Sequence, residues 1–157
     1  MSGATLLATW FGAGLLRPAP GTWGSFAALP FGWALAWWGG WPALLAGAIL
    51  VFAVGVWAAD VHCRAVGRHD ASEVVIDEVA GQWLTLLPAA IVAGTPSLAH
   101  LGAGFLLFRI FDVAKPWPCS LLDRKVKGGL GVMVDDVAAG IYGAAVLALL
   151  IWIGAMG

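Results

Sequence analysis

Residues 26–59 read FAALPFGWALAWWGGWPALLAGAILVFAVGVWAA and contain no Asp, Glu, Lys or Arg. Two further stretches, residues 79–108 and 137–157, also lack charged residues. The eight basic and nine acidic residues are confined to three places: Arg17, residues 60–78 and residues 109–136. Long uncharged stretches separated by short charged segments are typical of membrane spans and their connecting loops. This alternation predicts a polytopic membrane protein.

The composition supports lipid as the solvent. Apolar residues make up 61% of the 157 residues and charged residues 11%, against about 45–50% and about 25% in ordinary soluble domains. A chain of this size cannot hide so much apolar surface from water. The same composition excludes a disordered chain, the two Cys residues exclude a disulfide scaffold, and a net charge of −1 provides no basic surface for nucleic acid. We expect one membrane-embedded domain over residues 1–157.

Glycine and proline divide the uncharged stretches into helices. The breaks are Gly39-Gly40-Trp41-Pro42 in the first stretch and Gly94-Thr95-Pro96-Ser97 in the second. Because a full span needs about 20 residues, the first helix is short enough to be tilted or re-entrant. We expect an all-α bundle of four or five short helices, preceded by a short interfacial helix within residues 1–16. The expected helices cover residues 25–38, 42–59, 79–93, 98–112 and 137–155.

Two helical hairpins would return the chain to the side from which it started. They place the charged segments 17–25, 60–78 and 112–136 on one face of the bundle. Most basic residues flank spans in these segments, so the positive-inside bias makes this charged face cytoplasmic. The tryptophans Trp33, Trp37, Trp38 and Trp41 then form an aromatic belt at the opposite interface.

Five carboxylates on this face lie within a helical turn of an expected helix end: Asp77, Glu78, Asp112, Asp135 and Asp136. Carboxylates near membrane depth are costly and are rarely idle. Several can share a small site only if a cation offsets their repulsion, and oxygen ligands without a His or Cys pattern favour Mg²⁺ over zinc. Adjacent helical residues point about 100° apart, so we expect one residue of Asp77/Glu78 and one of Asp135/Asp136 to bind the metal. The alternative is that these side chains only cap helices.

Arg109 and Lys115 supply the opposite charge. Arg109 lies in an apolar helix and needs a carboxylate or phosphate partner. Lys115 is spaced to pair with Asp112 on one helical face. Cations, a metal ion and a carboxylate that activates water are together suited to a phosphoryl group. The alternative is that both cations only form structural ion pairs.

Two weaker signals concern substrate binding. The segment Gly21–Ser25 at a helix start could present backbone N–H groups to a phosphate, which makes Thr22 and Ser25 candidate contacts, although Ser25 could equally be a simple N-cap. Lys127, with its basic neighbours, could hold an anionic headgroup or only set topology. The glycines of segment 128–131 predict a flexible turn or loop.

Four motifs together resemble the phosphatidylglycerophosphatase A family: Ala19–Ser25, Val75–Glu78, Phe108–Pro118 and Gly131–Asp136. Their order and spacing match along nearly the whole chain. The resemblance implies an all-helical, Mg²⁺-dependent phosphatase of the bacterial inner membrane, which removes the terminal phosphate of phosphatidylglycerophosphate and leaves phosphatidylglycerol. It also implies that the site residues are Asp77, Glu78, Arg109, Asp112, Lys115, Asp135 and Asp136.

Other function classes are weighed against this one. A small membrane transporter or channel needs polar residues in mid-span along a path, whereas the expected mid-spans carry no charge. A non-catalytic assembly subunit would tolerate replacement of Asp77 or Asp135. Sequence motifs of CDP-alcohol phosphotransferases, haloacid dehalogenases and PAP2-type phosphatases do not occur in the chain.

Overall fold

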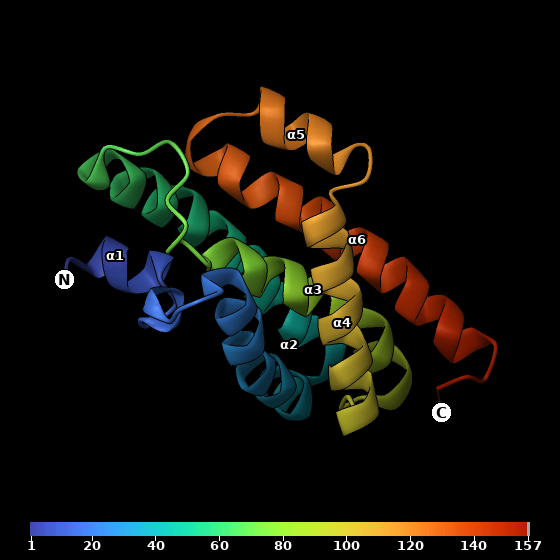
Figure 1. The fold of residues 1–157 in the computed structure, drawn as a ribbon. Helices are drawn as coiled ribbons and strands as arrows, with labels where there is room; N and C mark the ends of the chain where they lie inside the picture. Colours follow the sequence, from blue (N-terminus) through green and yellow to red (C-terminus); the bar gives the residue numbers. More distant parts are fainter. Residues whose placement is uncertain (157) are drawn as a thin grey trace.

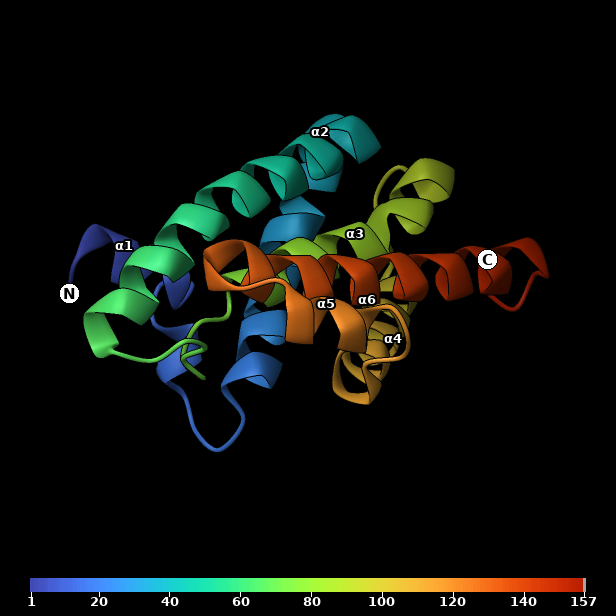
Figure 2. The same ribbon diagram turned by 90° about the horizontal axis from the view of Figure 1, so that it is seen from above.

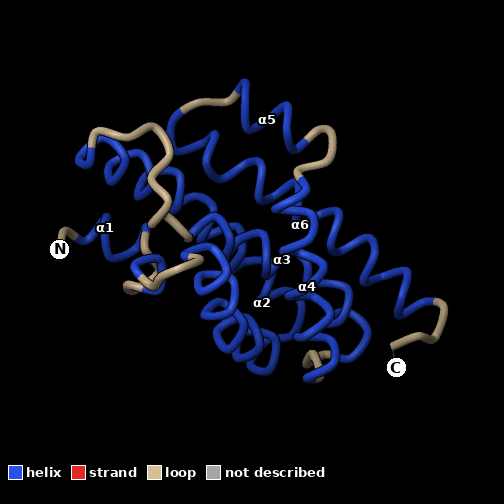
Figure 3. The backbone as a smooth tube through the Cα atoms, viewed as in Figure 1, coloured by secondary structure: helices blue, strands red, loops and turns tan. Residues whose placement is uncertain are grey.

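The computed structural model describes residues 1–156, which form only helices and loops (Figures 1 and 3). The all-α prediction is confirmed, but the expected number of four or five helices is not. These residues form six α-helices, the longest of which contains two helical segments, and one short 3-10 helix. The elements are α1 (Gly3–Ala8), η1 (Ala13–Leu15), α2 (Pro20–Val66), α3 (Ile76–Ala93), α4 (Leu98–Ala114), α5 (Cys119–Lys125) and α6 (Gly128–Trp152).

Helix α2 is the first expected hairpin. Pro20 begins it at a position where a helix does not need the missing N–H. The backbone leaves the helical conformation at Gly39 and Gly40, and Gly40 has φ 65° and ψ −161°, a conformation that glycine alone adopts easily. The second half then returns along the first, so that Gly47 faces the side chain of Leu35. The break at the glycine pair is confirmed, and both halves are longer than predicted.

Helix α3 lies at the centre of the bundle, between the second half of α2 and α6 (Figure 2). Its contact with α6 is backbone against backbone, because a Cβ on Gly140 would lie only 2.5 Å from the carbonyl oxygen of Gly81. The Thr85 hydroxyl bridges the two helices by donating to the carbonyl oxygens of Gly81 at 3.0 Å and Gly140 at 3.2 Å. Such close approach through small residues is typical of helices packed in membranes. It holds the first turn of α3 beside α6.

The segment 112–136, expected to be a loop, is largely helical. It contains α5 and the first turns of α6, which begins at Gly128 rather than at residue 137. The glycines expected to form a flexible turn instead permit packing, because a Cβ on Gly129 or Gly131 would collide with the backbone of Val56 or Val126, respectively. Asp135 and Asp136 therefore lie about two turns inside α6, not at its end.

Among the residues that the structure describes, three helices, α2, α3 and α6, are long and apolar enough to cross a membrane. The loop between α2 and α3 lies at the same side of the bundle as α5, whereas α4 begins at the other side (Figure 1). Near the break in α2, the side chains of Trp37 and Trp38 are 68% and 80% exposed, as expected for aromatic residues that face lipid or its interface.

Candidate active site

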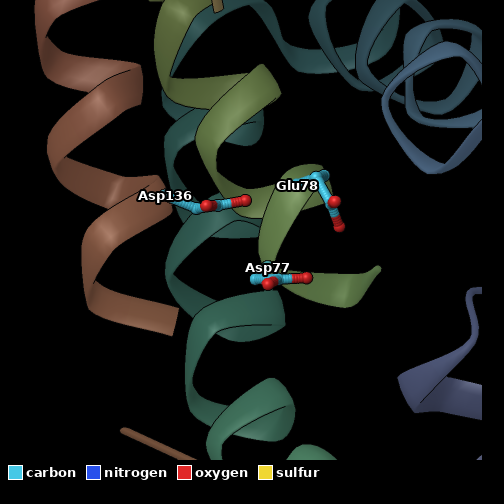
Figure 4. A group of neighbouring side chains, drawn as sticks. All are labelled: Asp77, Glu78 and Asp136. Atoms are coloured by element: carbon cyan, nitrogen blue, oxygen red, sulfur yellow. The ribbon is translucent and has the colours of Figure 1, made fainter. Parts of the chain in front are cut away.

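Three carboxylates from two helices meet beside the first turn of α3. Figure 4 shows Asp136 extending from α6 toward this turn, which carries Asp77 and Glu78. One oxygen of each carboxylate lies within 4.8 Å of the others. Acidic residues in the first turn of a helix are favoured by its dipole, so Asp77 and Glu78 suit their local position. Their proximity to Asp136 is imposed by the packing of α3 on α6.

One oxygen of each carboxylate in this acidic cluster lacks a hydrogen-bond partner in the described part of the protein. Glu78 and Asp136 are 9% and 4% exposed. Within residues 1–156, the buried atoms Asp77 Oδ1, Glu78 Oε2 and Asp136 Oδ2 accept no hydrogen bond. Buried carboxylate oxygens without partners are strongly unfavourable. A hard divalent cation takes oxygen ligands, so the donor set fits such an ion.

Arg109 lies against the acidic cluster. Its guanidinium is paired with Asp112 one turn further along α4, and its Nη1 is 3.9 Å from Glu78 Oε1. The Arg109 side chain is 20% exposed, so part of the guanidinium is accessible. Asp112 therefore fixes the orientation of a guanidinium that lies beside Glu78 of the cluster.

Lys115 does not pair with Asp112 as predicted from their spacing. Its Nζ instead lies 2.6 Å from Asp135 Oδ2 and 3.2 Å from Asp123 Oδ1. Lys115 ends α4 in the left-handed conformation, with φ 42° and ψ 58°, so its side chain leaves the helical face that carries Asp112. Burial alone lowers the pKa of Lys115, but its two carboxylate partners outweigh burial and raise that pKa above its ordinary value. The ammonium group therefore keeps its charge.

The pairs Asp77/Glu78 and Asp135/Asp136 differ in whether both side chains face the acidic cluster. Asp136 faces the cluster, whereas the adjacent Asp135 is neutralised by Lys115. This division follows from the angle of about 100° between neighbouring helical side chains. Asp77 and Glu78, in contrast, both contribute an oxygen to the cluster.

A cavity of about 170 Å³ opens over these groups. Pockets for drug-sized ligands measure about 300–1,000 Å³, so this cavity suits a headgroup-sized fragment rather than a whole lipid. All the expected acidic residues and Lys115 line it, whereas Arg109 lies behind Glu78 and Asp112 and is not part of the lining. Further polar lining residues are His69, Asp70, Ser72 and Asp123. Asp123 has no sequence pattern that marks it, because its helix α5 lies in a segment that was expected to be a loop.

Comparison with known proteins gives a consistent result. A family model described as Phosphatidylglycerophosphatase A matches residues 6–151. A protein of that name from Escherichia coli (strain K12) is 40% identical over 142 residues, covering 90% of this chain and 80% of the relative. Another from Haemophilus influenzae is 40% identical over 144 residues, covering 90% and 85%. The chain belongs to the phosphatidylglycerophosphatase A family.

A further relative of this chain comes from Bacteroides thetaiotaomicron. It is 38% identical over 159 aligned positions, covering 94% of this chain and 93% of the relative, and it is provisionally named a phosphatidylinositol-3-phosphatase. No solved structure matches the chain.

The residues expected from the sequence to contact substrate lie at different distances from the acidic cluster. The start of α2 adjoins the cluster, because a Cβ on Gly21 would lie 3.2 Å from Arg109 Nη1 and would collide with the Glu78 carboxylate. Thr22 follows Gly21 and is partly exposed. Ser25 is fully buried and donates to the Gly21 carbonyl oxygen at 2.9 Å. It is therefore not the N-cap of α2, which is Ala19.

Lys127 lies outside the cavity that holds the carboxylates. It lines a neighbouring pocket together with Arg64 and Arg68, and His69 lines both pockets. Within the segment Gly21–Ser25, which was expected to offer backbone N–H groups, Gly21 is the residue that lies against Glu78 and Arg109.

Proposed function

We propose that this protein hydrolyses phosphatidylglycerophosphate to phosphatidylglycerol and phosphate at the cytoplasmic side of a bacterial inner membrane. Family membership over residues 6–151 carries the assignment of the reaction. The single structural observation that supports it is the group of three buried carboxylates beside Arg109. Metal-binding oxygens next to a partly exposed guanidinium suit a phosphate monoester.

The cofactor of this proposal is Mg²⁺, held by Asp77, Glu78 and Asp136. These residues supply only oxygen ligands, which Mg²⁺ prefers. When bound, the ion supplies charge neutralisation and polarisation of the phosphoryl oxygens. Without a cation, three buried carboxylates would repel the dianionic headgroup.

The protein groups divide the remaining work. Arg109 binds phosphoryl oxygens as negative charge develops on them, and Asp112 orients its guanidinium. Water attacks phosphorus, its proton passes to a carboxylate of the cluster, and the bond between phosphorus and the glycerol oxygen breaks. The glycerol oxygen then takes up a proton. Lys115 ties α4 to α6 and α5 through Asp135 and Asp123, so it fixes the wall of the cavity.

The cytoplasmic orientation rests on the distribution of charge. The loop between α2 and α3 shares one side of the bundle with α5 (Figure 1), and both segments carry basic residues. A lipid substrate would reach the cavity with its acyl chains still in the bilayer. Only the headgroup needs to enter a space of about 170 Å³.

The decisive experiment measures phosphate release from phosphatidylglycerophosphate in detergent–lipid micelles, with Mg²⁺ and with EDTA. We expect Asp77→Asn, Glu78→Gln and Asp136→Asn each to lower kcat at least a hundredfold and to weaken Mg²⁺ binding in calorimetry. Asp60→Asn is the matched control, because Asp60 pairs with Arg64 on α2 outside the cavity. Full activity in EDTA would overturn the metal proposal. If phosphatidylinositol 3-phosphate were hydrolysed faster than phosphatidylglycerophosphate, the proposed substrate would be wrong, but the class of reaction would stand.

A further inference from the structure

His62 is a buried residue in α2 that the proposed mechanism does not use. Its side chain is 6% exposed, and it lies between two separate parts of the chain. Nδ1 is 3.2 Å from the hydroxyl of Thr5 in α1, and Nε2 is 3.5 Å from Glu73 Oε1 in the loop before α3. The carboxylate favours a proton on Nε2, which in the neutral ring leaves Nδ1 to accept from Thr5. His62 thus connects α1 to this loop.

Glu73 is the residue through which His62 contacts the loop before α3. Its other oxygen, Oε2, is 3.3 Å from Arg68 Nη1, and its side chain is 19% exposed. Burial opposes the charge of Glu73, but its backbone N–H, Arg68 and His62 outweigh burial and lower its pKa below the ordinary value. The carboxylate is therefore charged at neutral pH and available to both partners.

The backbone of the same loop is fixed by the N-terminal segment. The N–H of Val75 donates to the carbonyl oxygen of Ala8 at the end of α1, at 2.9 Å. Gly14 in η1 packs so closely on the carbonyl group of Glu73 that a Cβ there would collide with it. Two contacts that do not involve His62 therefore act on the same short stretch of chain.

This loop delivers the proposed metal ligands. Val75 is followed directly by Ile76, which begins α3, and then by Asp77 and Glu78. Five loop residues line the cavity itself: His69, Asp70, Ala71, Ser72 and Val74. A displacement of Glu73 would therefore move both one wall of the cavity and the first turn of α3.

We infer that His62 is a positioning residue, which acts through Glu73 to hold the loop 67–75 and thereby sets the place of Asp77 and Glu78. The inference rests on the proposed function only for its kinetic readout. A misplacement of about 1 Å at a reacting group can lower a rate by about a hundredfold. The expected effect falls on kcat rather than KM, because neither His62 nor Glu73 lines the cavity.

The test compares three replacements of His62. His62→Gln keeps an amide N–H at the position of Nε2, His62→Asn keeps one at the position of Nδ1, and His62→Leu keeps neither. We expect the Gln variant to retain kcat within about threefold, and the Asn and Leu variants to lose at least about tenfold with KM nearly unchanged. Equal losses in all three would show a purely structural role and would overturn the inference.

A double-mutant cycle with Glu73→Gln tests whether His62 acts through Glu73. It keeps the inference testable even if His62→Leu does not fold. Glu73→Gln alone is expected to lower kcat at least about tenfold, and adding His62→Asn is expected to lower it little further, because both act through one contact. Losses that multiply would contradict the inference. Arg64→Gln is the control variant, since the Arg64 side chain is 80% exposed and pairs with Asp60 on the same helix.

A second readout separates this inference from the substrate assignment. Mg²⁺ affinity, measured by calorimetry, is expected to fall in Glu73→Gln and His62→Asn but not in His62→Gln. If the unaltered protein released no phosphate from phosphatidylglycerophosphate, the proposed function would fail, and the Mg²⁺ affinities would still decide on His62. Unchanged affinity in Glu73→Gln and His62→Asn would overturn its positioning role.

Discussion

Replacement of Gly140 by Ala is expected to damage the site without touching any proposed catalytic group. A Cβ at this position would lie 2.5 Å from the carbonyl oxygen and 2.9 Å from the Cα of Gly81. Both atoms belong to the backbone of α3, so no side-chain rotation can relieve the overlap. Carbon and carbonyl oxygen pack at about 3.3 Å, which requires α3 and α6 to separate locally by about 0.8 Å.

That separation acts directly on the acidic cluster. Gly81 lies one turn after Glu78 on α3, and Gly140 lies one turn after Asp136 on α6. The hydrogen bond from Thr85 to the Gly140 carbonyl oxygen, now 3.2 Å, would be lost. Overpacking of this kind costs about 1–3 kcal/mol. A shift approaching 1 Å at the ligand oxygens is expected to lower kcat by about ten- to a hundredfold.

The assay combines phosphate release with thermal unfolding in the same micelles. Gly102→Ala is the matched control, because Gly102 lies inside α4 with no neighbouring atom within 4 Å of its added Cβ. We expect that control to keep its activity and to gain slightly in stability, by about 0.5–1 kcal/mol. A Gly140→Ala protein with unaltered kcat and Mg²⁺ affinity would refute the link between helix separation and catalysis.

Three further predictions concern single contacts. Lys115→Met leaves Asp135, only 7% exposed, without its cation. It is expected to lower stability by about 1–3 kcal/mol and to reduce phosphate release, with Lys115→Arg restoring part of both. Trp83→Phe removes the hydrogen bond from the indole N–H to Ala28, at 2.8 Å. It is expected to cost about 1 kcal/mol in thermal unfolding while kcat at low temperature is kept. The pKa of Glu73 is lower in the folded protein than its ordinary value of 4.5. The charged side chain therefore stabilises the protein fully at pH values above 4.5, and this stabilisation is lost as the pH falls through the lowered pKa. Relative to the intrinsic exchange rate at each pH, protection of the amides in residues 67–75 should therefore fall on acidification, and it should be low at every pH in Glu73→Gln.

The turns of the bundle could be predicted because their signals are local. Gly40 has a positive φ, and Ser97 caps α4 through its own side chain, so both breaks follow from the chemistry of the residues at the turn. The two hairpins account for the placing of the charged segments on one side of the bundle. The contact of Asp136 with Asp77 and Glu78 depends in addition on the packing of α3 on α6, because Asp136 lies about two turns inside its helix.

The start of α6 could not be predicted because it depends on distant residues. Three glycines within four positions weaken an isolated helix by about 1 kcal/mol each. Here Gly129 allows close contact with the backbone of Val56 in α2, and this tertiary packing overrides the local preference. The partners of Lys115 were missed for a related reason, since its left-handed backbone is not visible in a spacing rule.

The burial of α3 bears on how the protein enters a bilayer. In its most apolar window 61% of the residues are covered by the rest of the protein, against 33% in α2 and α6. Neighbouring helices, rather than lipid tails, therefore surround Gln82 and Thr85, which are both fully buried. During synthesis, insertion depends on the hydrophobicity of each emerging segment, and α3 is the least hydrophobic of the three long helices. Helix α3, which carries two of the proposed metal ligands, is thus expected to depend on the previously inserted α2 hairpin for its own integration, so that membrane insertion and formation of the acidic cluster are coupled.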